Sequence, residues 1–227
     1  MKNKQISIAE VVAKIPSGAT LMINGFMGCG NPHKIIEALA ASGVKDLTVI
    51  ANDASMPVGP QGEDFYGIAK LIHNHQVKTL IASHVGLNPE VAQQMNAGEL
   101  EVILIPQGSL AEMIRAGGAG LGGIITPTGV GTIVEDQSYT IGKTEIDGKQ
   151  YLIQRPLKAD IALISGFQVD ESGNVWYRGT TRTFGPLMAL AAETVIVEAD
   201  HLVSAIEPEN IVTPGVLVDF VTAKKVS

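Results

Sequence analysis

The sequence predicts an α/β fold with a mainly parallel sheet and helices on both faces of that sheet. Short apolar runs alternate with helical segments, a spacing typical of strand–helix–strand units. Hydrophobic residues make up 45% of the chain and aromatic residues only 4%, so aliphatic side chains must fill the core. Strands that helices cover on both sides are rich in such residues. The first apolar run also ends in a glycine loop and a proline, which is typical of a strand-to-helix junction.

The order of elements follows from these runs. Strands are predicted at Thr20–Gly25, Leu47–Ala51, Thr79–Ser83, Val102–Ile105, Ile161–Ser165 and Thr194–Glu198. Helices are predicted at His33–Ser42, Asp64–Asn74, Pro89–Ala97, Leu110–Arg115 and Pro186–Ala192. Asn88 is expected to cap the helix that begins with Pro89.

The pattern changes between residues 132 and 155. Alternating apolar and polar residues surround Gly142-Lys143 and Asp147-Gly148, which predicts two antiparallel hairpins. We interpret this stretch as a small antiparallel β excursion inserted in the α/β fold, not as an independent domain. Residues 1–227 are therefore expected to form a single domain.

Composition excludes several classes of protein. The formal net charge is −7, so a basic surface for nucleic acid is not expected. One cysteine allows no intrachain disulfide, and residues 1–14 lack the apolar core of a signal peptide. Ala116–Val134 carries no charge, but it is too rich in glycine for a membrane span, and we expect a packed loop there. A soluble cytoplasmic protein without membrane contact is expected.

The loop after the first strand is the first candidate site. Its backbone N–H groups and the following helix N-terminus lie where α/β proteins commonly bind anions. A dinucleotide fingerprint is incomplete, because His33 stands where its third glycine would be. A tight turn without a ligand and an anion site both remain open. The candidate residues are Gly25, Phe26, Met27, Gly28, Cys29, Gly30 and Asn31.

Two further side chains have reactive groups near predicted strand ends. Cys29 lies near a helix N-terminus, where a thiol pKa can fall enough to make a nucleophile, but a small buried thiol also fits such a turn. His84 follows a strand, where it can contact a ligand or bond to the backbone. No cluster has zinc spacing, and His73-Asn74-His75 is too close for a helical metal pair, so no metal is expected.

Gln107 is the strongest single candidate. It follows the strand Val102–Ile105, so its amide is expected at a strand end just before a helix. A glutamine there can donate to a carbonyl oxygen that develops negative charge, as an oxyanion-hole donor does. Ser109 is expected to cap the helix with Glu112 at N3, which leaves Gln107 free.

The densest glycine region follows this helix. It includes Gly117, Gly118 and Gly120. Ordering such a loop costs conformational entropy, so it is expected to allow the close approach of a ligand or of another subunit. An unoccupied structural loop is the remaining alternative.

Together these segments resemble the A (α) subunit of family I coenzyme A transferases, of the acetate/acetoacetate (butyrate–acetoacetate) type. The resemblance covers essentially the whole chain. Asn24 stands where the family commonly has a glycine. The matching segments are Gly25–Pro32, Pro106–Glu112, Arg115–Gly120, Thr126–Thr132, Lys158–Ala162 and Ile211–Gly215.

The resemblance implies a coenzyme A transferase/isomerase-like fold and a coenzyme A thioester as substrate, with no permanently bound cofactor. It assigns Gln107 to the thioester carbonyl and places Gly108 and His84 among the substrate-binding residues. The Gly25–Gly30 and Gly117–Gly123 loops are expected to line the acyl pocket and the interface with the partner subunit. The family's glutamate nucleophile lies in a Glu-Asn-Gly segment of a separate B subunit. Here Glu209-Asn210 is followed by Ile211, so this chain is expected to be half of an enzyme.

The expected partner is therefore a B subunit, in a heterodimer or an α2β2 assembly, and copies of this chain can also associate with each other. A succinyl-CoA:3-oxoacid transferase subunit is one alternative function. A stand-alone sugar-phosphate isomerase or deaminase of similar fold is another.

Overall fold

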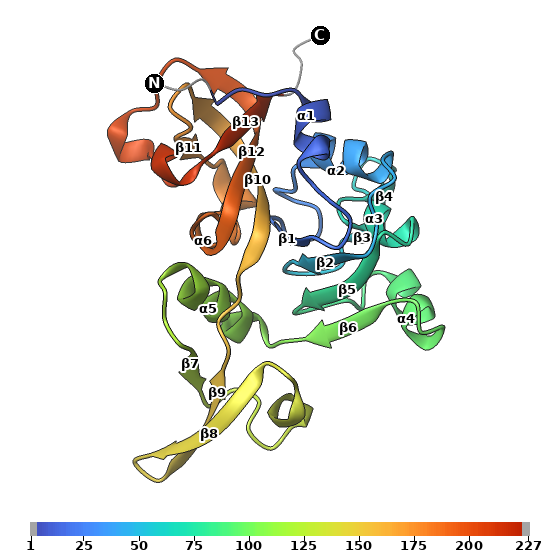
Figure 1. Cartoon of the computed structure of the whole chain (residues 1–227), viewed down its shortest axis with the longest axis vertical. Helices are drawn as coiled ribbons and strands as arrows, with labels where there is room; N and C mark the ends of the chain where they lie inside the picture. The colour runs from blue at the N-terminus through green and yellow to red at the C-terminus, as the bar shows by residue number, and fades with distance from the viewer. Residues whose placement is uncertain (1–3, 224–227) are drawn as a thin grey trace.

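A computed structural model describes residues 4–223, and its central element is an eight-stranded sheet (Figure 1). The strand order is β13-β12-β10-β1-β2-β5-β6, and all of these neighbours are parallel. β11 pairs antiparallel with β10. The strands are β1 (Thr20–Ile23), β2 (Leu47–Ile50), β5 (Val77–Ala82), β6 (Glu101–Leu104), β10 (Ala159–Asp170), β11 (Val175–Trp176), β12 (Ala192–Val203) and β13 (Phe220–Ala223).

Helices cover both faces of this sheet, which confirms the predicted fold class. Leu21 and Ile23 of β1 belong to one buried cluster, and Met22 between them belongs to a second. Because successive side chains of a strand point to opposite faces, the two clusters are the two sides of the sheet. The first cluster includes side chains of α1 (Ile8–Ala13), α2 (His33–Ala40), α3 (Ala69–His73) and α4 (Pro89–Asn96), and the second those of α5 (Gln107–Gly118) and α6 (Gly185–Ala191).

Two predicted helices have different bounds in the structure. The prediction of a helix from Asp64 is wrong, because β4 (Asp64–Tyr66) pairs there with β3 (Met56–Val58) and the helix begins only at Ala69. Phe65 and Gly67 both have positive φ, at 52° and 58°, which no helix allows.

The helix predicted at Leu110–Arg115 is longer in the structure and begins at Gln107, with Pro106 as its N-cap. The prediction that Ser109 caps this helix is therefore wrong. Ser109 lies inside the helix and is buried.

The antiparallel excursion is a three-stranded sheet that projects beyond α5 (Figure 1). It contains β7 (Ile124–Thr126), β8 (Thr140–Ile146) and β9 (Lys149–Gln154), in the order β7-β9-β8. The hairpin at Asp147-Gly148 is confirmed, with φ of 50° and 74° as a type I′ turn requires. The hairpin predicted at Gly142-Lys143 is wrong, because β8 runs through these residues beside β9.

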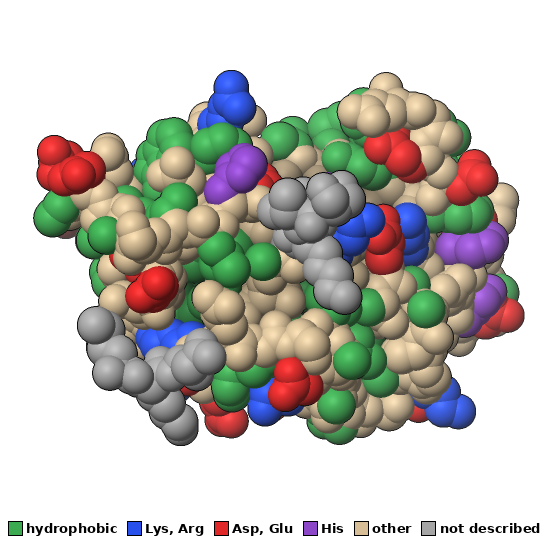
Figure 2. Space-filling view, turned by 90° about the horizontal axis from the view of Figure 1, so that it is seen from above, with side chains coloured by type: hydrophobic (Ala, Val, Ile, Leu, Met, Phe, Trp, Pro, Cys, Tyr) green, Lys and Arg blue, Asp and Glu red, His purple; other side chains and the backbone are tan. Residues whose placement is uncertain are grey.

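The prediction of a packed loop from 116 to 134 is wrong in part, because this stretch contains the end of α5, β7 and the start of a 3-10 helix, η1 (Ile133–Asp136). Within residues 4–223 no helix combines the length and apolar composition needed to cross a membrane. On the face shown in Figure 2, basic side chains are scattered among acidic ones and do not form one large patch. The remaining 3-10 turns are η2 (Gly179–Arg182), η3 (Pro208–Asn210) and η4 (Gly215–Leu217).

Candidate active site

Three polar side chains from different segments of the chain meet at the carboxyl edge of the parallel sheet. Gln107 Nε2 donates to Asn52 Oδ1 at 2.9 Å, and Ser83 Oγ donates to the same oxygen at 3.0 Å. Asn52 follows β2, Ser83 follows β5 and Gln107 begins the helix after β6. This edge is where open α/β sheets bind their ligands.

The Gln107 amide retains the capacity to donate to a ligand. A carboxamide nitrogen has two N–H groups, and one of them is used by Asn52. Gln107 is exposed, whereas Asn52 behind it is buried at 4% exposure. The amide is thus held from the protein side and open on the solvent side, as an oxyanion donor must be.

The glycine loop after β1 is a tight turn whose shape depends on two residues with positive φ. The backbone groups of Phe26 and Cys29 bond to each other in both directions at 2.9 Å. Between them Met27 and Gly28 have φ of 50° and 82°. A Cβ on Gly28 would lie 2.1 Å from the ring of Tyr66, so only glycine fits there.

Asn24 ties this loop to the chain around residue 181. Its Nδ2 donates to Gly30 O at 3.1 Å and to Thr181 O at 3.2 Å, and its Oδ1 accepts from the Thr183 hydroxyl. Asn31 donates in turn to the Asn24 carbonyl. Asn24 is fully buried, so it acts as an internal brace and not as a ligand contact.

Asp53 connects the loop after β1 to the loop after β2. Its two oxygens accept from the backbone N–H groups of Met27 at 2.8 Å and Ser55 at 2.7 Å. Burial raises the pKa of this carboxyl, although the two N–H donors and nearby His84 act in the opposite direction. With both oxygens occupied and 5% exposure, Asp53 is a structural carboxylate.

The N-terminus of α2 holds an anion that the chain itself supplies. Ile35 N donates to Glu198 Oε2 at 2.8 Å, and Glu198 on β12 is 2% exposed. Pro32 is the N-cap and provides no side-chain hydrogen bond. The position at which the sequence suggested a ligand anion is therefore occupied, at least at this N–H, by Glu198.

Comparison with known proteins gives the family. The sequence profile described as "Coenzyme A transferase" matches residues 5–224. The chain is 46% identical over its full length to the acetate CoA-transferase subunit alpha of Escherichia coli (strain K12), of which it covers 100%. It is 48% identical over 97% of its length to the acetoacetyl-CoA:acetate/butyrate CoA transferase alpha subunit of Clostridium acetobutylicum, of which it covers 98%.

The chain belongs to the coenzyme A transferase family. Among solved structures, the acyl-CoA transferase YdiF of Escherichia coli O157:H7 has the same fold, with a TM-score of 0.84 at 24% identity over 98% of this chain. The chain spans 47% of the YdiF polypeptide, about half of it. The two sequence relatives are named as alpha subunits, that is, as parts of heteromeric coenzyme A transferases.

The second glycine region lies at the opposite end of α5 from the polar cluster of this coenzyme A transferase chain. Gly117 and Gly118 are about 15 Å from Gln107 along the helix axis. A Cβ on Gly117 would lie 1.8 Å from Leu157 O, and one on Gly118 would lie 2.5 Å from Leu190 Cβ. These two glycines let α5 pack closely, and the structure does not bring them to Gln107.

The other three candidate residues, Gly120, His84 and Cys29, are exposed or face open space. Gly120 has φ of 69°, and a Cβ at this position would meet nothing within 4 Å, so it is a turn residue facing open space. His84 is exposed beside Asp53, with which it forms a backbone bridge. Cys29 is exposed, and its Sγ lies 3.8 Å from the hydroxyl of Thr180, which is not a base.

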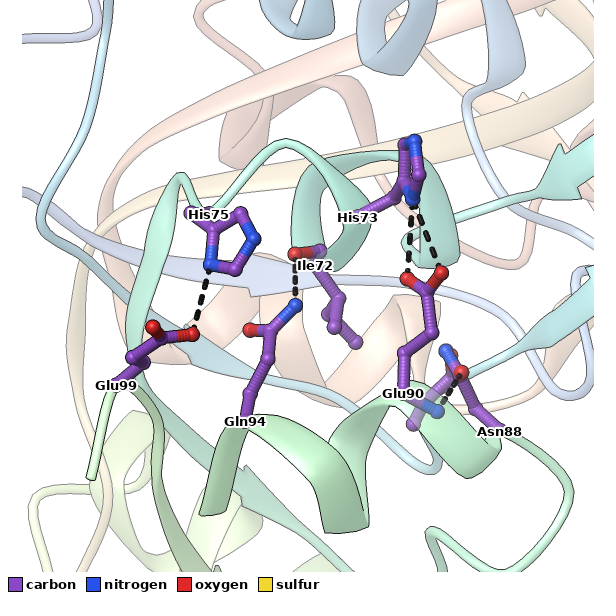
Figure 3. A network of polar contacts seen from close by, with 8 residues as sticks. Ile72, His73, His75, Asn88, Glu90, Gln94 and Glu99 are labelled. Carbon is purple, nitrogen blue, oxygen red and sulfur yellow. Dashed lines mark hydrogen bonds and ion pairs between the residues drawn. The ribbon is translucent and has the colours of Figure 1, made fainter. Parts of the chain in front are cut away.

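His73, the last residue of α3, and His75, just after it, contact glutamates in α4 and just after α4 (Figure 3). His73 Nδ1 lies 3.1 Å from both carboxylate oxygens of Glu90, and His75 Nδ1 lies 3.4 Å from Glu99 Oε2. Asn88 caps α4, as predicted, by accepting from Glu90 N. Among residues 4–223, no three His, Cys, Asp or Glu side chains are placed to share a metal ion.

Sequence reasoning missed the residues that support the site. Asn24, Asn52, Asp53 and Glu198 are polar residues in or beside apolar strands, and Thr183 lies between η2 and α6. Each has a partner distant in sequence. The one available signal was position, since Asn24 and Asn52 each follow an apolar run at a strand end. Such residues meet at one edge of a parallel sheet.

Proposed function

We propose that this chain is the A subunit of a coenzyme A transferase that moves coenzyme A between a short-chain acyl-CoA and a carboxylic acid of the acetate, butyrate or acetoacetate class. The observation that carries this proposal is the Gln107 amide, braced by Asn52 and open to solvent at the carboxyl edge of the sheet. The names of its relatives support the substrate class.

In the proposed reaction a glutamate carboxylate of a separate B subunit attacks the acyl-CoA carbonyl. Coenzyme A leaves as its thiolate and a mixed anhydride forms. The thiolate then attacks the glutamyl carbonyl of the anhydride, which releases the first carboxylate and leaves a glutamyl thioester. The carboxylate of the second acid attacks this thioester, which expels the coenzyme A thiolate and forms a second mixed anhydride. The thiolate then attacks the acyl carbonyl of that anhydride, which gives the new acyl-CoA and frees the glutamate.

Gln107 has a defined part in this sequence. Its free N–H would donate to the thioester carbonyl oxygen as negative charge develops during attack. Asp53, the carboxylate next to Asn52, is excluded as the nucleophile because both of its oxygens accept backbone N–H groups. Asp53 therefore does not compete with a nucleophile from another chain.

The test is acetoacetyl-CoA formation from acetyl-CoA and acetoacetate, by this chain alone and after co-expression with a coenzyme A transferase B chain. Activity only in the presence of the B chain, with both chains in the native mass of the complex, is the expected result. Full activity of this chain alone would mean that the nucleophile is here and would overturn the proposal. The Cys29→Ala variant of the two-chain enzyme is expected to retain full activity.

A further inference from the structure

The β3–β4 hairpin packs against the glycine loop after β1 through one aromatic ring. Tyr66 is the last residue of β4, and a Cβ on Gly28 would lie 2.1 Å from its ring. The ring therefore fills the space that a side chain at Gly28 would take. The same ring lies against the imidazole of His33, with 4.5 Å between the two ring centroids. Gly28 O accepts from His33 Nε2 at 2.9 Å, so Tyr66 and His33 together enclose Gly28.

The hairpin is itself held in place by α3. Phe65, the residue before Tyr66, stacks on His73 with 3.7 Å between the ring centroids and 17° between the ring planes. His73 is held in turn by the carboxylate of Glu90 (Figure 3). On the other side, a Cβ on Gly59 would lie 2.8 Å from the Tyr66 ring, so two glycines leave room for this ring. The aromatic residues of β4 thus join α3 to the glycine loop.

Backbone strain is concentrated around the same loop. Among residues 4–223, seven non-glycine residues have positive φ, and three of them are Asp or His, which adopt this conformation more readily than most residues. Strain in the remaining four persists only where surrounding contacts fix the backbone, and it is typical of functional sites. These four lie in the loop, in the hairpin or in hydrogen-bond contact with the loop; they are Met27, Ser55, Phe65 and Thr183, with φ of 50°, 54°, 52° and 34°.

A short series of hydrogen bonds links the strained turn to Gln107. Met27 N, one residue before Gly28, donates to Asp53 Oδ2 at 2.8 Å. Asp53 follows Asn52 in the sequence, and Asn52 Oδ1 accepts from Gln107 Nε2 at 2.9 Å. Asn52 and Asp53 are both buried, so neither has much room to move independently. A displacement of Met27 is therefore expected to change the orientation of the Gln107 amide.

We propose that Tyr66 is a positioning residue for the transfer reaction. Its ring holds Gly28 in place, which keeps Met27 N bonded to Asp53 and the Gln107 amide directed at the thioester carbonyl. Tyr66 acts through Gln107 and not on the reacting atoms. This inference rests on the proposed function and gives the β3–β4 hairpin a part in it.

The test is a double-mutant cycle in the two-chain enzyme, with Tyr66→Ala, Gln107→Ala and the two changes combined. Tyr66→Ala alone is expected to lower kcat about tenfold, since a misplacement of about 1 Å can cost as much as 10²-fold in rate. KM for acetyl-CoA and for acetoacetate is expected to stay unchanged, because the Gln107 donor acts in the transition state. When Gln107→Ala is already present, Tyr66→Ala should lower kcat less than about twofold, because the group through which Tyr66 acts is gone.

A merely structural role of Tyr66 gives a different pattern. A smaller fraction of folded or assembled enzyme lowers kcat by the same factor with and without Gln107, and this result would overturn the proposal. A rise in KM for either substrate at unchanged kcat would also overturn it, because Tyr66 would then contact that substrate.

Two further variants control for the loss of an aromatic side chain. Tyr66→Phe keeps the ring and is expected to keep the wild-type kcat; a kcat as low as that of Tyr66→Ala would contradict the role of the ring. Tyr151 is the matched control, since it is a half-buried tyrosine on β9 of the small sheet. Tyr151→Ala is expected to leave kcat unchanged in both backgrounds.

Amide hydrogen exchange of the complex gives a readout that does not depend on transfer. The Met27 N–H is expected to exchange faster in Tyr66→Ala than in the wild type, and at the wild-type rate in Tyr66→Phe and Tyr151→Ala. An unchanged rate in Tyr66→Ala would overturn the proposal. Failure of the proposed function is visible separately, as absence of transfer by the wild-type complex, and the exchange rate at Met27 then still decides whether Tyr66 holds the turn.

Discussion

The Gln107 amide donates to Asn52 Oδ1 at 2.9 Å, and the Ser83 hydroxyl donates to the same oxygen at 3.0 Å. Asn52 is therefore a shared acceptor that fixes the orientation of an exposed carboxamide from a buried position. With its oxygen accepting twice, the Asn52 carboxamide cannot flip without losing both bonds. This arrangement also fixes which atom of Gln107 points inward and leaves one N–H for a ligand.

Replacement of Gln107 by alanine is expected to lower kcat of the two-chain enzyme about 10²–10³-fold, the usual cost of one oxyanion donor. The variant is expected to assemble normally, because Gln107 is exposed. Steady-state kinetics and native mass are the two measurements. Asn52→Ala is expected to show a smaller decrease in kcat, because the Gln107 amide is still present but has lost the hydrogen bond that fixes its orientation. Wild-type turnover in Gln107→Ala would refute the assignment.

Replacement of the buried Asn24 by alanine removes bonds to Gly30, Thr181 and Thr183. At about 1 kcal/mol for each lost bond, the free energy of unfolding is expected to fall by about 3 kcal/mol. Urea unfolding measures the change. Asn210→Ala is a suitable control because Asn210 is exposed, and its stability is expected to match the wild type. Equal stability of the two variants would contradict the bracing role.

Glu198 is expected to stabilise the start of α2 through Ile35 N. Glu198→Gln keeps an acceptor but loses the charge, so a decrease of about 1 kcal/mol in the free energy of unfolding is expected. Glu198→Ala also leaves a cavity and an unpaired N–H, for an expected loss of about 3 kcal/mol. Amide hydrogen exchange at residues 35 and 36 should accelerate in both variants. A Glu198→Ala variant as stable as the wild type would show that the helix terminus needs no carboxylate.

Tyr177 is predicted to make stability depend on pH in the alkaline range. Burial raises the pKa of its phenol from 10.0 to about 12, although the 2.8 Å hydrogen bond with Thr213 and nearby Arg182 act against this. Because the folded state holds the proton more tightly than the unfolded chain, this stabilisation is complete below pH 10 and is lost as pH rises through about 12.

Tyrosinate absorbance measured against pH is expected to show a late step at about 12 that is absent from Tyr177→Phe. At neutral pH the same variant is expected to lose about 1–2 kcal/mol, since Thr213 is left with an unsatisfied buried hydroxyl. Identical titration curves for the two proteins would contradict the predicted burial effect.

The sheet could be predicted from the sequence because its strands are short apolar runs separated by helices. Their ends differ from the prediction by a few residues at most for β1, β2, β5 and β6. β13 and α1 were missed, since both are short and have mixed polarity. The false helix at Asp64 had apolar residues at helical spacing, but it lacked any local sign of the positive φ at Phe65.

Only part of the candidate site could be predicted from the sequence. Gln107 could be placed because a strand end fixes where the next residues lie. Ser109 was misplaced because a capping pattern depends on where the helix begins, and Pro106 begins it earlier. The Asn24–Thr183 contact joins residues 159 positions apart, and no local pattern of residues encodes such a partner.

The pairing of β1 with β10 has a consequence for how the chain is made. Leu21 lies opposite Ile161, and the contact between Thr20 and Asp160 closes a separation of 140 residues. At a synthesis rate of about 5–20 residues per second, roughly 7–28 s pass between the synthesis of β1 and that of β10, and one edge of β1 stays unpaired during this time. During that time the β1-β2-β5-β6 half presents an unpaired, apolar strand edge, a known template for aggregation. Chaperone protection is thus expected to matter most while the N-terminal half of the chain has been synthesised and β10 has not yet emerged.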